Sequence, residues 1–179
     1  MYFPEEPLDL CPSEGGGYFS VKMGQKLNGG KLQVVRKLGY GSRSSTWLVR
    51  GKEKYFAIKI YTIAASEHAK TMEVPILKVV HGLARSGGLP KCYGDFWEET
   101  RAGSHLCLVL DPMSTTVQAL MHEADHERLP VHAVQRIVLT VVDALSSLHN
   151  VGIMHGGTKF FSCTMIVRVL TTVMSSCCS

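Results

Sequence analysis

One stretch of the chain, residues 39–59, restricts the possible folds more than any other. It reads GYGSRSSTWLVRGKEKYFAIK: a tight turn with two glycines, a β-branched and aromatic run, a charged turn, and a second apolar run that ends on Lys59. The pattern predicts three antiparallel strands over residues 31–38, 46–50 and 55–61. A loop with so little side chain lets backbone N–H groups approach a polyphosphate. Lys59 can then contact the phosphates as a point charge.

The same stretch resembles the ATP-binding lobe of protein kinases. In that family a glycine-rich loop precedes a Val-Ala-Ile-Lys-like strand, which here reads Phe56-Ala57-Ile58-Lys59. Ser44 replaces the third glycine of the general kinase loop. This departure, together with Gly17-Tyr18 and the stretches over residues 21–24 and 34–38, is similar to the SR-protein kinases, which phosphorylate Arg-Ser-rich splicing factors.

The resemblance implies an α+β, protein kinase-like fold with an antiparallel small-lobe sheet, one helix and a truncated, mainly helical large lobe. It implies ATP as the cofactor and Arg-Ser-rich proteins as substrates. The expected parts are a flexible leader (residues 1–24), a small lobe (25–112), a partial large lobe (113–160) and a divergent tail (161–179). The residues expected to surround ATP are Gly39, Gly41, Ser44, Thr46, Ala57, Lys59, Glu73, Leu110, Asp111 and Met113.

The composition excludes several other classes of protein. With 45% hydrophobic residues and a net charge of +4 over 179 residues, the chain is globular rather than disordered. Its basic residues are scattered, so nucleic-acid binding is not expected. The six cysteines and eight histidines form no zinc-binding spacing. The acidic, proline-containing start is unlike a signal or transit peptide, so the expected location is the cytoplasm or the nucleus.

A helix is expected over residues 66–80, where it would cover one face of the sheet. Ser66 is a suitable N-cap for this helix. By resemblance, Glu73 pairs with Lys59 and fixes it for the phosphates; the alternative is that Glu73 is a solvated helix residue. Pro75 removes an intrahelical hydrogen bond at a cost of about 3 kcal/mol, so we expect it to kink or delay the helix and to misdirect the pair.

The next segment carries the expected hinge. A strand over residues 89–97, a polar turn over 98–104 and a buried apolar strand over 105–110 precede Asp111-Pro112-Met113. By resemblance, Leu110 is the gatekeeper, and the Asp111 carbonyl and the Met113 N–H bind the adenine edge. The alternative is a buried strand that ends at a proline. Both can hold at once.

A short helix over residues 117–123 and a long one from Pro130 to about residue 149 follow. The long helix is apolar almost all round, which predicts burial on nearly every side. It is short for a membrane span and carries Gln135, Arg136 and Asp143, so no membrane contact is expected.

The expected catalytic loop departs from the kinase pattern. His155 and Lys159 match it, but Gly157 stands at the position of the catalytic aspartate and Ser162 at that of the metal-binding asparagine. No aspartate or glutamate follows His155. No intact catalytic residue and no metal site are therefore expected, and magnesium binding is doubtful.

Three functions remain open from the sequence. The first is an ATP-binding relative of the SR-protein kinases that transfers little or no phosphate. The second is a non-catalytic fragment, or an interaction module whose exposed large-lobe helix binds a protein partner. The third is an active protein kinase.

Overall fold

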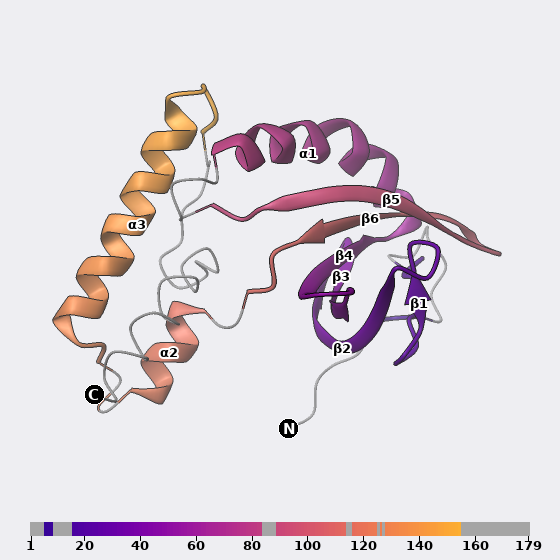
Figure 1. Cartoon of the computed structure of the whole chain (residues 1–179), viewed down its shortest axis with the longest axis horizontal. Helices are drawn as coiled ribbons and strands as arrows, with labels where there is room; N and C mark the ends of the chain where they lie inside the picture. Colours follow the sequence, from indigo (N-terminus) through magenta and orange to yellow (C-terminus); the bar gives the residue numbers. More distant parts are fainter. Residues whose placement is uncertain are drawn as a thin grey trace. The chain divides into compact units, whose positions relative to one another are not determined.

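The computed structural model describes residues 6–8, 16–83, 89–113, 116–124, 126 and 128–154 (Figure 1). The chain divides into two compact units: the first holds Met1–Val79 and Lys91–Pro112, and the second holds Val80–Pro90 and Met113–Ser179. The catalytic-loop positions His155, Gly157, Lys159 and Ser162, and the tail over residues 161–179, lie outside the described residues.

The first unit is built on a six-stranded antiparallel sheet with the order β1-β2-β3-β4-β6-β5. The strands are β1 (Lys26–Leu27), β2 (Leu32–Gly41), β3 (Ser44–Arg50), β4 (Tyr55–Tyr61), β5 (Cys92–Thr100) and β6 (Gly103–Leu110). The predicted meander is present as β2, β3 and β4, and the apolar strand over 105–110 is part of β6. The sequence analysis missed β1, which has only two residues.

The turn between β5 and β6 is shorter than the predicted stretch over residues 98–104. The strands continue to Thr100 and restart at Gly103, because the Thr100 side chain closes the turn. Its Oγ1 accepts hydrogen bonds from the backbone N–H groups of Ala102 and Gly103 and donates one to the Gly103 carbonyl. Glu98 and Glu99 therefore lie on a strand rather than in a loop.

The sheet has two apolar faces because successive side chains of a strand point to opposite sides. On β4, Ile58 and Ile60 join one core, which also contains Trp47, Val49 and Val109. Tyr61 belongs to the other core, where Leu106 and Leu108 of β6 pack against the buried residues Ala65, Ala69 and Val74 of α1. Helix α1 (Ile63–Leu83) covers this second face (Figure 1).

Helix α1 is longer than predicted and begins before Ser66. The Ser66 side chain is buried and does not cap the helix: it donates to the Thr62 carbonyl and accepts from the Leu106 N–H on β6. Pro75 lies inside the helix, which continues for two further turns to Leu83. The expected late start therefore does not occur.

The leader differs from the loosely attached segment that its glycine content predicts. The Phe19 side chain is buried in the core that also contains Val34 of β2 and Trp47 of β3. The Gly17 carbonyl accepts a hydrogen bond from the Ile63 N–H, and the Gly24 N–H donates to the Val34 carbonyl. Because an aromatic side chain and several backbone groups of residues 16–24 are engaged, this part belongs to the folded unit.

The second unit contains α2 (Val117–Glu123) and α3 (Val131–His149), both close to their predicted bounds. Thr116 caps α2 by accepting a hydrogen bond from the Ala119 N–H. Ile137 packs with Val117, while Ala144 and Leu148 pack with Val80 and Leu89.

The predicted burial of α3 on nearly every side is wrong. Only Ala133, Ile137, Ala144 and Leu148 are buried along it, whereas Val131 is 73% and Leu139 is 63% exposed. By length and composition alone, α3 is the one helix in the described part of the chain that could cross a membrane. Core helices of soluble proteins meet the same criterion, so this property is weak support for a span.

Candidate nucleotide-binding site

An ion pair joins the sheet to the helix that covers it. Lys59 lies on β4 and Glu73 on α1, and Lys59 Nζ is 2.8 Å from Glu73 Oε1. The pair therefore forms in spite of Pro75, two residues beyond Glu73. The two side chains are 28% and 39% exposed, so a ligand can reach them, and solvent screening leaves the pair little effect on stability.

Tyr61 lies beside this pair, two residues after Lys59 on the same face of β4. Lys59 Nζ is 4.6 Å from the centre of the Tyr61 ring. The Tyr61 hydroxyl is buried and has no hydrogen-bond partner of good geometry among the described residues. Burial raises the pKa of Tyr61, and the neighbouring Glu73 raises it further. The sequence analysis missed this residue, although its i+2 spacing from Lys59 could have revealed it.

The glycine loop is a hairpin between β2 and β3. Gly41 pairs with Ser44 and Gly39 with Thr46, so the turn itself contains only Ser42 and Arg43. Neither Gly39 nor Gly41 has a positive φ, and a Cβ at either position would meet nothing within 4 Å. Neither the backbone conformation nor the protein's own packing therefore requires glycine at these two positions.

The expected hinge begins at the end of β6. Ala57 pairs with Leu110 across the sheet and is buried, while Leu110 is half-buried. The Asp111 side chain is held in place: Oδ1 accepts a 2.6 Å hydrogen bond from the Tyr93 hydroxyl, and Oδ2 accepts from the Lys91 N–H. Met113 belongs to the second unit.

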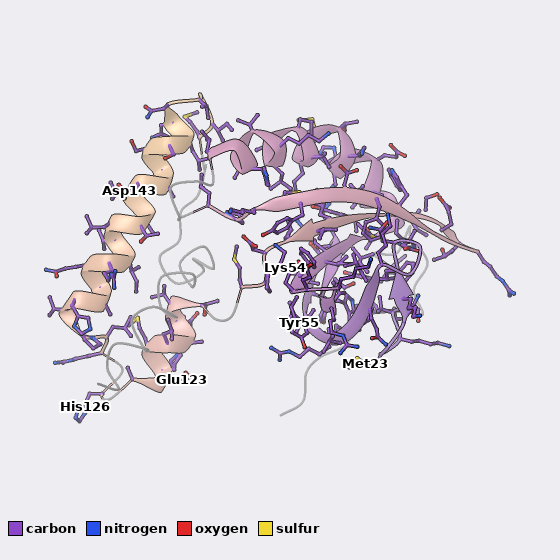
Figure 2. All side chains as sticks on the ribbon, viewed as in Figure 1. Met23, Lys54, Tyr55, Glu123, His126 and Asp143 are labelled. Carbon is purple, nitrogen blue, oxygen red and sulfur yellow. The ribbon has the colours of Figure 1, made fainter. Side chains whose placement is uncertain are left out.

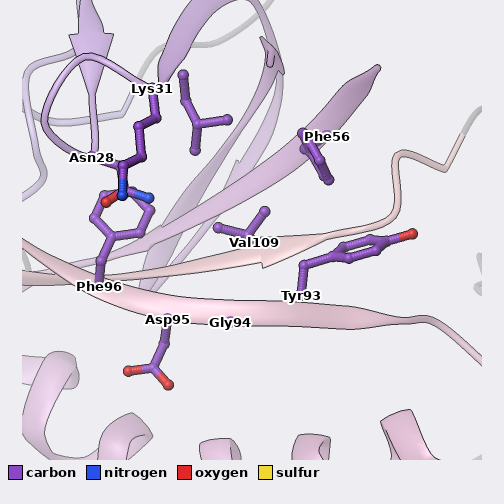
Figure 3. Close-up of a pocket in the computed structure, with 9 residues that line it drawn as sticks. Asn28, Lys31, Phe56, Tyr93, Gly94, Asp95, Phe96 and Val109 are labelled. Atoms are coloured by element: carbon purple, nitrogen blue, oxygen red, sulfur yellow. The ribbon is translucent and has the colours of Figure 1, made fainter. Parts of the chain in front are cut away.

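A pocket of about 350 Å³ lies on the other face of the sheet, which the sequence analysis did not predict (Figure 3). Its apolar lining includes Phe56, Phe96 and Val109, and Phe56 points away from the Lys59 side of β4. Asp95 also borders it, but its carboxylate pairs with Lys70 of α1. This pocket is therefore separate from the Lys59–Glu73 pair.

The described residues contain no group of three or more His, Cys, Asp or Glu side chains that could hold a metal ion. Asp143, the last acidic residue of the sequence, lies on α3 and is exposed (Figure 2). It belongs to the second unit, whereas Glu73 belongs to the first.

Comparison with known proteins gives relatives that are named as protein kinases. A mouse protein named SRSF protein kinase 3 is 31% identical over 154 residues, which cover 82% of this chain and 26% of the mouse protein. Protein kinase dsk1 of Schizosaccharomyces pombe is 25% identical over 80% of this chain and 28% of its own length. The chain thus spans about a quarter of these curated relatives. No protein-family model matches it.

Solved structures share the fold. One kinase domain aligns with a TM-score of 0.69 at 22% identity, covering 81% of this chain and 42% of that domain. The PknI kinase domain of Mycobacterium tuberculosis aligns with a TM-score of 0.60 at 21% identity, covering 79% of this chain and 56% of that domain. Relatives and fold together identify this chain as a member of the protein kinase superfamily that is similar to the SR-protein kinases.

Proposed function

We propose that this chain binds ATP in its first unit, between the glycine hairpin and the Lys59–Glu73 pair. The observation that carries the proposal is the 2.8 Å contact between Lys59 and Glu73. A lysine held by a carboxylate has its ammonium group fixed in advance, so it loses less side-chain entropy when it contacts phosphate. In protein kinases the same pair positions the phosphates.

The glycine hairpin fits a phosphate-bearing ligand. A Cβ at Gly39 or Gly41 would meet open space, so the chain's own packing gives no reason for glycine there. A ligand that approaches the backbone closely does give one, because it would occupy the space of a Cβ. The buried Ala57 is likewise small where the adenine ring is expected.

Phosphoryl transfer by this chain is proposed to be weak or absent. Gly157 stands where kinases carry the catalytic aspartate, and a positioned general base contributes about 10²–10⁴-fold to rate. Ser162 replaces an asparagine carbonyl with a hydroxyl, a poorer ligand for magnesium. The chain is thus proposed to bind nucleotide without transferring phosphate at an appreciable rate.

Titration of the 179-residue chain with ATP tests the binding proposal. Wild type is expected to bind, and Lys59→Ala to lose at least about tenfold in affinity, since a charge-assisted contact to phosphate contributes about 1.5–3 kcal/mol. Lys26→Ala, at an exposed position on β1, is the matched control and keeps wild-type affinity. Absence of binding by wild type would refute the proposal.

A phosphate-incorporation assay with an Arg-Ser peptide tests the second part. Wild type is expected to label the peptide no faster than Lys59→Ala. Transfer clearly above that control, at rates usual for protein kinases, would instead support the active-kinase alternative.

The second candidate function is binding of a protein partner through α3. Val131, Val138, Leu139 and Val142 form an exposed apolar stripe on this helix, and such patches usually mark an interface or an aggregation risk. Leu139→Lys is expected to reduce hydrophobic-dye binding and self-association, whereas Gln118→Lys, at an exposed polar position on α2 and outside this stripe, leaves both unchanged. A wild-type monomer without dye uptake would count against this candidate.

A further inference from the structure

The tip of the glycine hairpin is held by the leader segment. The Tyr18 hydroxyl donates a 2.7 Å hydrogen bond to the Gly41 carbonyl, across 23 positions of sequence. The Tyr18 ring also meets the Tyr40 ring edge-on, with centroids 6.3 Å apart. Burial raises the pKa of Tyr18, with a further effect from Tyr40, so its hydroxyl keeps the proton that it donates.

Gly17, the residue before Tyr18, contacts the start of α1. The Gly17 carbonyl accepts a 3.1 Å hydrogen bond from the Ile63 N–H, the first residue of the helix. Thr62, one residue earlier, donates its N–H to the Arg43 carbonyl at the other side of the hairpin turn. Gly17 and Tyr18, here called the strap, therefore tie the glycine hairpin to the helix that carries Glu73.

The strap is held in place by the buried side chain of the residue that follows it. Phe19, the next residue, is only 5% exposed and packs edge-on against the His105 ring, with centroids 5.1 Å apart. The side chain after Tyr18 is thus fixed in the core, and the Tyr18 hydroxyl is presented to the hairpin from a rigid support. A free leader would have to lose this conformational freedom each time it met the loop.

The hydrogen bond sets the direction of a peptide group in the turn. Every peptide bond described is trans, so the carbonyl of Gly41 and the N–H of Ser42 point in opposite directions. Fixing the Gly41 carbonyl toward Tyr18 directs the Ser42 N–H away from the strap. Backbone N–H groups of such turns are the natural donors to phosphate oxygens.

We propose that Tyr18 is a positioning residue for nucleotide phosphates: through its hydrogen bond to Gly41 it holds the hairpin in the orientation that receives them. This inference rests on the proposed ATP site and adds to it a residue that lies outside the glycine loop. Because Tyr18 acts only on the hairpin, its effect is confined to the phosphate part of the ligand and does not extend to the adenosine part.

Tyr18→Phe is the test variant, since it removes the hydroxyl and keeps the ring that contacts Tyr40. Tyr55→Phe is the matched control, because Tyr55 is 50% exposed at the start of β4. The first readout is amide hydrogen exchange of residues 40–44 in the nucleotide-free chain. Loss of one hydrogen bond is expected to speed this exchange by about 2–10-fold in Tyr18→Phe and to leave Tyr55→Phe unchanged.

The second readout compares ATP with adenosine. Tyr18→Phe is expected to weaken ATP binding by about 2–10-fold and to leave adenosine binding unchanged. Equal weakening of both ligands would mean that Tyr18 only supports the fold, and unchanged exchange of residues 40–44 would mean that the strap does not hold the hairpin; either overturns the inference. If wild type bound neither ligand, the ATP site would be refuted, while the exchange result would still decide whether the strap exists.

Discussion

His105 is an almost completely buried titratable side chain that takes no part in the candidate site. It is 1% exposed, and its Nδ1 lies 2.9 Å from the Tyr61 carbonyl. Because a carbonyl can only accept, Nδ1 carries the proton of the neutral ring. Burial lowers the pKa of His105 and outweighs the opposite effects of this hydrogen bond and of Glu99.

The buried imidazole predicts a fold that weakens in acid. The folded pKa lies below the unfolded value of 6.5, so the unfolded chain binds more protons as the pH falls. Stability is therefore complete above about pH 6.5 and is lost progressively below it. Urea unfolding at a series of pH values should show this loss.

Two variants separate His105 from the other titratable groups. His105→Gln is expected to flatten the slope between about pH 5 and 6.5, whereas His149→Gln, at an exposed position on α3, is expected to keep it. Equal slopes in wild type and His105→Gln would show that this histidine does not control acid stability.

Gly39 offers a second residue-scale prediction, because its φ is not positive and a Cβ there would meet nothing. Gly39→Ala is expected to raise stability by about 0.4–1 kcal/mol, since alanine restricts the unfolded chain, and yet to weaken ATP binding. Gly103→Ala is the contrast: its φ is +148° and the new Cβ would lie 3.2 Å from Ile63, so it should be destabilising. Unfolding curves and ATP titrations of both variants check this, and unchanged ATP affinity in Gly39→Ala would contradict the account.

Among the elements, α1 shows most clearly what local sequence can and cannot predict. Its existence and its contact with the sheet follow from the sequence pattern, whereas the Lys59–Glu73 pair follows from the resemblance to protein kinases. Its start does not, because the Ser66 hydroxyl meets Leu106 of β6, forty residues away, and is not free to cap the helix. The leader is a second example. Its glycines predict a loosely attached segment, but Phe19 packs into a core that forms only when the sheet folds.

Because Pro75 lies inside α1, we expect the helix to be less stable than the same helix without a proline. The proline removes one backbone hydrogen bond from the helix interior, and packing of Val74 and Ala69 against the sheet holds the helix together around it. Pro75→Ala is therefore expected to raise the free energy of unfolding by about 1–3 kcal/mol. Chemical denaturation measures this change, and Met72→Ala, at an exposed position, is the control. A Pro75→Ala variant no more stable than wild type would mean that the proline costs the folded helix nothing.

At the scale of the whole molecule, the chain combines one well-defined unit with a second that exposes much of its longest helix. The first unit contains every residue expected to surround ATP except Met113. The sequence allows these residues to be proposed because the resemblance to protein kinases rests on local features, namely glycine spacing, strand alternation and a lysine. It missed Tyr61 and the hold of Tyr18 on the hairpin, which depend on contacts between distant segments.

We propose that a nucleotide site remains in this chain although Gly157 and Ser162 stand where protein kinases carry a catalytic aspartate and a metal-binding asparagine. Measuring the ATP affinity of the 179-residue chain with and without magnesium tests this claim most directly. We expect measurable binding in both conditions, with magnesium tightening it by no more than about twofold, because the described residues contain no group of acidic side chains that could hold the ion. Binding that is absent in both conditions, or that tightens about tenfold with magnesium, would contradict the account.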